Sequence, residues 1–101
     1  MKNNVMKNYY IVSLCKNGIL GGGLVVSDDS ITYRTNKFTV PQKYRSLMMQ
    51  YKNIQGLSKA WMLCFPTVTV HMDDGESYKF IVFSRAKLIS LLEEKTGFKT
   101  V

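Results

Sequence analysis

The sequence predicts a mainly β protein, with about seven short antiparallel strands followed by one C-terminal α-helix. Three observations indicate this class. Along most of the chain up to residue 83, apolar residues alternate with polar ones, which is the pattern of half-buried strands. Clusters of glycine, aspartate, asparagine and serine separate these runs and supply turns. Only residues 85–96 repeat their apolar positions with the period of an amphipathic helix.

The first three strands are predicted at 9–14, 20–26 and 31–35. The second strand contains three consecutive glycines at 21–23, which would let it bend or let a neighbouring backbone approach closely. The first turn is expected at 16–18. A four-residue turn at 27–30 places Val26 opposite Ile31 and keeps the apolar side chains of both strands on one face. Because turn and pattern agree, we expect a hairpin here.

The middle of the chain has a weaker pattern. Residues 41–45 are expected to form a loop that starts at a proline, and residues 47–51 a fourth strand. We interpret residues 54–59 as a turn or irregular piece and residues 60–65 as a fifth strand. Residues 61–65 are apolar at every position, so both faces of this strand would be buried or covered by a partner.

A clear hairpin follows, with strands on either side of Asp73-Asp74-Gly75. A three-residue loop with Gly75 in the left-handed conformation sets Val70 opposite Tyr78 and gathers the apolar side chains on one face. This register leaves Thr67 and His71 on the polar face. A shift of one residue would exchange the two faces, so we predict this loop and no other.

The C-terminal helix is predicted at 85–96. Ser84 is expected to cap its first turn, and Gly97 is expected to end it. Three leucines at positions 88, 91 and 92 form the stripe that would face the core.

Composition favours one globular domain spanning residues 1–101. The 101 residues are 46% hydrophobic, which excludes a disordered chain. The formal net charge is +7, and it is unevenly placed. Residues 1–60 hold nine basic and two acidic groups, whereas residues 61–101 hold five of each. An anionic partner is therefore worth considering.

The cysteines and the apolar runs bear on compartment. Cys15 and Cys64 are far apart and His71 is the single histidine, so no zinc-binding set is present and no metal is expected. We expect two reduced, buried thiols, with Cys64 in the core, in a cytoplasmic protein. The uncharged stretch 60–72 is shorter than the roughly 18 residues that span a membrane. The apolar run 9–14 is also too short for a secretory signal.

Several stretches of this chain carry a family resemblance: 22–34, 51–54, 66–70, 74–80, and the helix opened by Ser84-Arg85. Their hydrophobic spacing and turn glycines resemble the pleckstrin-homology-like (PH-like) superfold, in its bacterial or GRAM-like form, over about residues 20–96. The resemblance implies a partly open barrel with the helix plugging one end. It implies no catalytic residues and no cofactor. The basic first loop with which pleckstrin-homology domains bind phosphoinositides is reduced here to Lys16.

A basic stretch at 34–52 provides the candidate site for an anionic partner, and no acidic residue occurs anywhere from 31 to 72. Its candidate residues are Arg34, Lys37, Lys43, Arg45 and Lys52. They predict docking to an anionic membrane surface or to an acidic protein, although charges that only keep the protein in solution are an equal alternative. Nucleic acid is not expected as a partner, because alternation turns Tyr33 and Tyr51 towards the core.

The alternative function is protein–protein assembly, as a homodimer or a complex subunit, through apolar strand faces. Met48 and Met62 lie on such faces, and methionine suits adaptable contacts. Catalysis is not expected, because no paired titratable groups or nucleophile motif can be identified. The predicted function is thus a non-catalytic binding or scaffold module.

Overall fold

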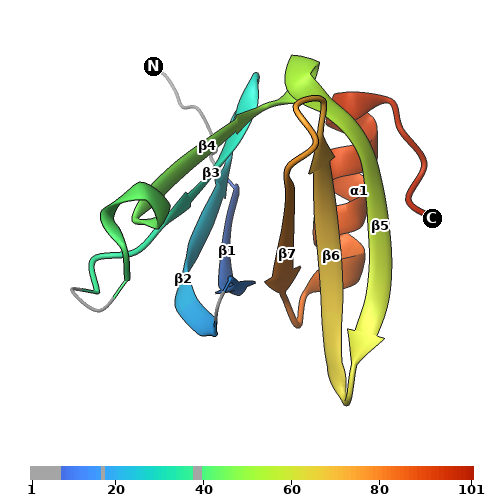
Figure 1. Ribbon diagram of the computed structural model, residues 1–101. Helices are drawn as coiled ribbons and strands as arrows, with labels where there is room; N and C mark the ends of the chain where they lie inside the picture. The colour runs from blue at the N-terminus through green and yellow to red at the C-terminus, as the bar shows by residue number, and fades with distance from the viewer. Residues whose placement is uncertain (1–7, 17, 38–39) are drawn as a thin grey trace.

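The computed structural model describes residues 8–16, 18–37 and 40–101 (Figure 1). Seven strands form one antiparallel sheet in the order β4-β3-β2-β1-β7-β6-β5. The strands are β1 (Asn8–Cys15), β2 (Ile19–Val26), β3 (Ser30–Arg34), β4 (Ser46–Gln50), β5 (Ile54–Met62), β6 (Phe65–Met72) and β7 (Ser77–Ile81). Short 3-10 helices η1 (Gln42–Tyr44) and η2 (Tyr51–Asn53) flank β4, and helix α1 (Arg85–Thr96) follows β7. The predicted fold class is confirmed.

The sheet curls into a half-barrel, and α1 lies against its β7-β6-β5 side (Figure 1). Sheet and helix enclose one core, in which Tyr33, Phe80, Leu88 and Leu92 are fully buried. The ring centroids of Tyr33 and Phe80 lie 5.9 Å apart. Burying a side chain of this size stabilises the fold by roughly 1.5–3 kcal/mol.

Strand register follows the predicted pattern at both hairpins. Val26 pairs with Ile31 across the β2–β3 turn, and Val70 pairs with Tyr78 across the β6–β7 turn. Gly75 has a φ of 92°, a backbone conformation that glycine adopts without steric cost. Of the predicted turn at 16–18, residue 17 lies outside the described residues.

The segment 54–65 corrects the prediction. Residues 54–59, expected to be irregular, belong to the long strand β5, and the chain reverses at Leu63 and Cys64 into β6. Met62 pairs with Phe65, so this hairpin has a two-residue loop. The sequence pattern conceals the turn because neither loop residue is a usual turn former. Leu63 has a φ of 59°, in the left-handed region that costs a leucine about 1–2 kcal/mol.

Three side chains are buried differently from the prediction. Cys64, expected in the core, is exposed because it forms the hairpin turn, and Cys15 is half-buried; both thiols are free. Burial raises the pKa of the Cys15 thiol, which keeps it protonated. Thr67, expected on a polar face, is buried, and its hydroxyl donates a hydrogen bond to the Ala60 carbonyl at 3.1 Å.

The helix α1 has the predicted bounds but lacks one predicted contact. Ser84 occupies the cap position, yet its side chain makes no capping hydrogen bond; its backbone carbonyl accepts the N–H of Leu88 at 3.2 Å. Gly97 ends the helix with a φ of 80°. Leu88 and Leu92 point into the core, whereas Leu91 is only partly buried.

Deprotonation of Tyr51 at alkaline pH lowers the stability of the fold. Its hydroxyl donates a hydrogen bond to the Ser27 carbonyl at 2.6 Å. Burial, with added repulsion from Asp29 and Asp28, raises the pKa of Tyr51 to about 12. Because the folded state holds this proton more tightly than the unfolded chain, its contribution to stability is complete below a pH of about 10 and is lost as pH rises towards 12.

We therefore expect the free energy of unfolding to fall above a pH of about 10, and to fall less steeply in Tyr51→Phe. Urea unfolding across the alkaline range measures both slopes. Tyr33 and Tyr78, whose pKa values burial also raises, keep part of the slope in the variant. Equal slopes in the two proteins would contradict this assignment to Tyr51.

Candidate anion-binding groove

A groove crosses the sheet where β2 carries its glycines. The groove has a volume of about 790 Å³, and its walls come from β1 and from the chain between β3 and β4. Strand β2 forms the bottom of the groove, and the hollow above it stays open because Gly21 and Gly23 have no side chains. The ring of Tyr9 lies directly against Gly23, and the ammonium of Lys37 lies 3.0 Å from where a Cβ of residue 21 would stand.

Gly22, between them, permits the close backbone approach that the sequence predicts. A Cβ at this position would stand 2.5 Å from the Arg34 carbonyl and 2.8 Å from the ring of Tyr33. Tyr33 is fully buried and its hydroxyl donates a hydrogen bond to the Leu20 carbonyl at 2.6 Å. Gly22 is therefore needed for close packing against β3, whereas Gly21 and Gly23 leave space for the groove.

Three predicted cations line this groove: Arg34, Lys37 and Arg45. Arg45 is held in place, because its Nε donates a hydrogen bond to the Val40 carbonyl at 2.9 Å. No acidic residue is among those that line the groove. Clustered like charges focus a positive potential into the hollow, which favours an anionic partner.

Two ion pairs lie away from the groove. One joins Lys16 to Glu76 and the other joins Lys95 to Asp28, each with an N···O distance of 3.7 Å. Both are partly exposed and add little stability. Neither pair involves a residue that lines the groove.

Two of the predicted cations lie outside the groove. Lys43, on η1, has its ammonium 5.0 Å from the centroid of the Tyr44 ring. Lys52, on η2, lines a separate hollow that also contains Asp28 and Asp29. An anionic ligand there would meet carboxylates as well as the lysine, so the two sites differ in charge.

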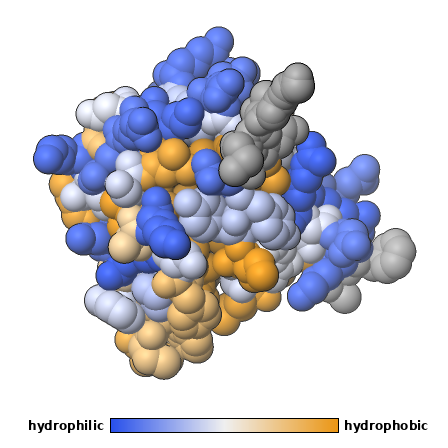
Figure 2. All heavy atoms as spheres, turned by 180° about the vertical axis from the view of Figure 1, so that it is seen from behind, coloured by the Kyte–Doolittle hydropathy of each residue, from blue (hydrophilic) through white to orange (hydrophobic). Residues whose placement is uncertain are grey.

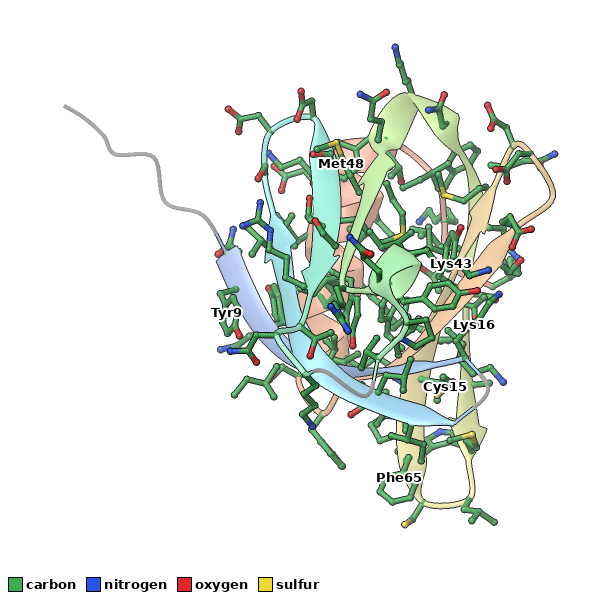
Figure 3. The ribbon with its side chains drawn as sticks, turned by 60° about the vertical axis from the view of Figure 1, so that its left-hand side comes forward. Tyr9, Cys15, Lys16, Lys43, Met48 and Phe65 are labelled. Atoms are coloured by element: carbon green, nitrogen blue, oxygen red, sulfur yellow. The ribbon has the colours of Figure 1, made fainter. Side chains whose placement is uncertain are left out.

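The two predicted interface methionines are not brought together. Met48 is 61% exposed on the edge strand β4. Met62 is half-buried and pairs with Phe65, which lies at the opposite end of the molecule from Met48 (Figure 3). The two methionines therefore do not belong to one surface patch.

Two groove residues, Tyr9 and Ile11, were missed by the sequence analysis. Ile11 is 79% exposed beside the cations, on the outer face of β1. The alternation of β1 contains the signal, because Val12 and Leu14 face the core and therefore turn Ile11 outwards. An exposed isoleucine within a basic hollow gives the groove an amphipathic lining.

His71 lies on the polar side of the β6–β7 hairpin, as predicted. Its Nε2 lies 2.8 Å from the Ser58 hydroxyl, and its Nδ1 lies 2.9 Å from the Ser77 hydroxyl. Across residues 8–16, 18–37 and 40–101, no group of three potential metal ligands gathers. Within the same residues, no helix has the length and apolar content to cross a bilayer.

No protein-family model matches this chain, and no curated protein matches it in sequence. Solved structures do match the chain in fold. The chain is similar to the C-terminal domain of an unknown protein from Leishmania infantum, with a TM-score of 0.75 and 10% identity, over 92% of this chain and 84% of the other. It is also similar to a chain of the Spt16D Pob3N heterodimer, with a TM-score of 0.64 and 8% identity, over 97% of this chain and 54% of the other.

This likeness extends over nearly the whole chain and agrees with the curled antiparallel sheet and C-terminal helix. The fold is PH-like. The chain spans about half the length of the heterodimer component that it matches. PH-like folds, like other widespread folds, carry many unrelated activities, so function must be argued from the groove and the rest of the surface.

Proposed function

We propose that this PH-like chain is a non-catalytic module that docks to anionic membrane surfaces through the basic groove. The observation that carries the proposal is the acid-free hollow lined by Arg34, Lys37 and Arg45 beside the exposed Ile11. In this proposal the protein is cytoplasmic and peripheral to the membrane, and it belongs to the GRAM-like, bacterial kind of PH-like domain. It requires neither metal nor cofactor.

The chemistry of the lining favours a membrane surface over a soluble acidic protein. Headgroup phosphates would meet the cations, while Ile11 and the Tyr9 ring would meet the less polar layer just below. Each basic residue near an anionic bilayer contributes about 1 kcal/mol, so three converging cations would strengthen binding by roughly 100-fold.

The double variant Arg34→Glu/Lys37→Glu tests the groove. We expect it to bind phosphatidylserine-containing vesicles at least about 30-fold more weakly than the wild type, because two attractions become repulsions. Vesicle co-sedimentation at low and physiological salt measures this, with pure phosphatidylcholine vesicles in parallel. Binding by the wild type should weaken as salt rises.

The matched control is Lys79→Glu/Lys99→Glu, which changes net charge equally at exposed positions outside the groove. It should retain most of the binding. Equal losses in the two double variants would show that net charge alone matters. Salt-independent binding, or none, would overturn the proposal.

Protein–protein assembly remains the second candidate, and one observation favours it. Met48 projects from β4, an edge of the sheet, where a further strand could pair. A similar structure belongs to a heterodimer. Under this alternative, light scattering after size exclusion would show a dimer that Met48→Glu converts to monomer, whereas a wild-type monomer would count against self-assembly.

A further inference from the structure

The β5–β6 hairpin projects beyond the rest of the protein, and its turn marks the lower end of the molecule (Figures 1 and 3). We call its apolar end, together with one neighbouring side chain, the apolar tip; it consists of Trp61, Leu63, Phe65 and Phe83. Phe83 belongs to it because its ring packs edge-on against Phe65, with centroids 6.1 Å apart.

The apolar tip is unusually exposed for such side chains. Leu63 is 91% exposed, Phe83 74% and Trp61 64%. Seen from behind, the surface shows apolar side chains reaching the lower end of the molecule (Figure 2). Phe65 and Phe83 lie on one face of the hairpin and Trp61, which pairs with Pro66, lies on the other, so the end of the hairpin is apolar on both faces. Exposed apolar groups of this kind mark surfaces that bind something.

Backbone strain supports the same conclusion. Leu63 holds a φ of 59° although glycine would fit this turn without cost. Its side chain adds almost no packing, since it is nearly all exposed. A strained leucine that does not stabilise the fold is best explained by what it contacts outside the protein.

Two cations, Arg85 and Lys87, lie beside side chains of the apolar tip. The guanidinium of Arg85 lies 4.7 Å from the centroid of the Trp61 ring, and its Nη1 donates a hydrogen bond to the Ala60 carbonyl at 2.7 Å. Lys87 lines a hollow beside Phe83. No acidic residue occurs in the first turn of α1.

The apolar tip is continuous with the basic groove. The hollow that contains Phe83 and Lys87 is also lined by Tyr9 and Ile11, and these two residues line the groove as well. Neither lining contains an acidic residue. The acid-free linings therefore lead from the cations of the groove to Phe83, whose ring packs on Phe65 at the end of the hairpin.

We infer that the apolar tip inserts into the boundary between headgroups and acyl chains of an anionic bilayer, with Leu63 deepest and Trp61 at the interface. This inference rests on the proposed function and names the part of the chain that enters the lipid. A bilayer fits the shape, because it accepts a projecting wedge without the complementary pocket that a protein partner would need. Tryptophan and arginine are suited to the interface, where an apolar body and a polar end are both satisfied.

Trp61 is the single tryptophan of the chain, so it reports directly on insertion. Adding vesicles of phosphatidylserine and phosphatidylcholine should shift its emission to shorter wavelength, and brominated acyl chains should quench it. Leu63→Gly and Phe83→Ala should each weaken vesicle binding by about tenfold, from the apolar area removed. Leu63→Gly should fold at least as well as the wild type, because glycine relieves the strained φ.

The matched control is Met48→Ala, which removes an exposed apolar side chain from the opposite end of the molecule and should leave binding unchanged. Salt-sensitive binding without an emission shift or quenching, and with Leu63→Gly as effective as wild type, would overturn insertion and leave the groove proposal standing. Insertion that is unaffected by Arg34→Glu/Lys37→Glu would confirm the apolar tip and overturn the groove. A blue shift that appears on concentrating the protein without vesicles would identify a second copy as the occupant and overturn the inference.

Discussion

Phe80→Ala is expected to lower the free energy of unfolding by about 4 kcal/mol, a large part of the stability of a domain of this size. Phe80 is 1% exposed, and its ring packs against the ring of Tyr33 from β3. Alanine would leave a cavity that a curled sheet closed by a helix cannot collapse to fill. The shift of the urea midpoint, at an unchanged slope, measures the loss.

Phe83→Ala is the matched control, since it makes the same chemical change three residues further along. Phe83 is 74% exposed, so the free energy of unfolding should change by no more than about 0.5 kcal/mol. Similar losses at the two positions would mean that the core is not centred on the Tyr33–Phe80 contact.

Gly22→Ala is expected to destabilise the protein by about 2–3 kcal/mol. The added Cβ would stand 2.5 Å from the Arg34 carbonyl, on the paired strand, and 2.8 Å from the buried ring of Tyr33. Neither neighbour can move freely, because one is backbone in a ladder and the other is fully buried with a bonded hydroxyl. Thermal unfolding should show a clearly lower midpoint.

Gly21→Ala, one position earlier, should be nearly neutral or slightly stabilising. Its Cβ would meet only the Lys37 ammonium, at 3.0 Å, and a flexible side chain can give way. Alanine also loses less conformational freedom than glycine on folding. If both substitutions were equally harmful, the close approach at residue 22 would not be the cause.

Local signals were sufficient to predict most of the fold. At the β6–β7 hairpin, Gly75 supplies a left-handed turn and strict alternation fixes the register, so the two signals agree. At the β5–β6 hairpin, neither the turn residues nor the alternation of apolar and polar residues predicts the reversal. Leu63 and Cys64 form a tight turn inside an uninterrupted apolar run, and no residue type marks the reversal.

The candidate site was predictable only in part, for a similar reason. The acid-free stretch of sequence identifies Arg34, Lys37 and Arg45 because they lie close together along the chain as well as in space. Tyr9 reaches the groove only through the pairing of β1 with β2, which places its ring on Gly23. A contact that depends on how two strands pair cannot be predicted from the spacing of residues along one strand.

The two edges of the sheet differ in how far a second copy could extend them. At the β5 edge, Thr100 bridges Leu57 in parallel, and Val101 exchanges backbone hydrogen bonds with Leu57 and Lys59 at 3.1 and 2.9 Å. The other edge is β4. A sheet that can pair at both edges can polymerise, whereas one with a single available edge stops at a two-fold pair. Thr100 and Val101 therefore occupy part of the β5 edge, which leaves β4 as the more open of the two edges for pairing with another strand.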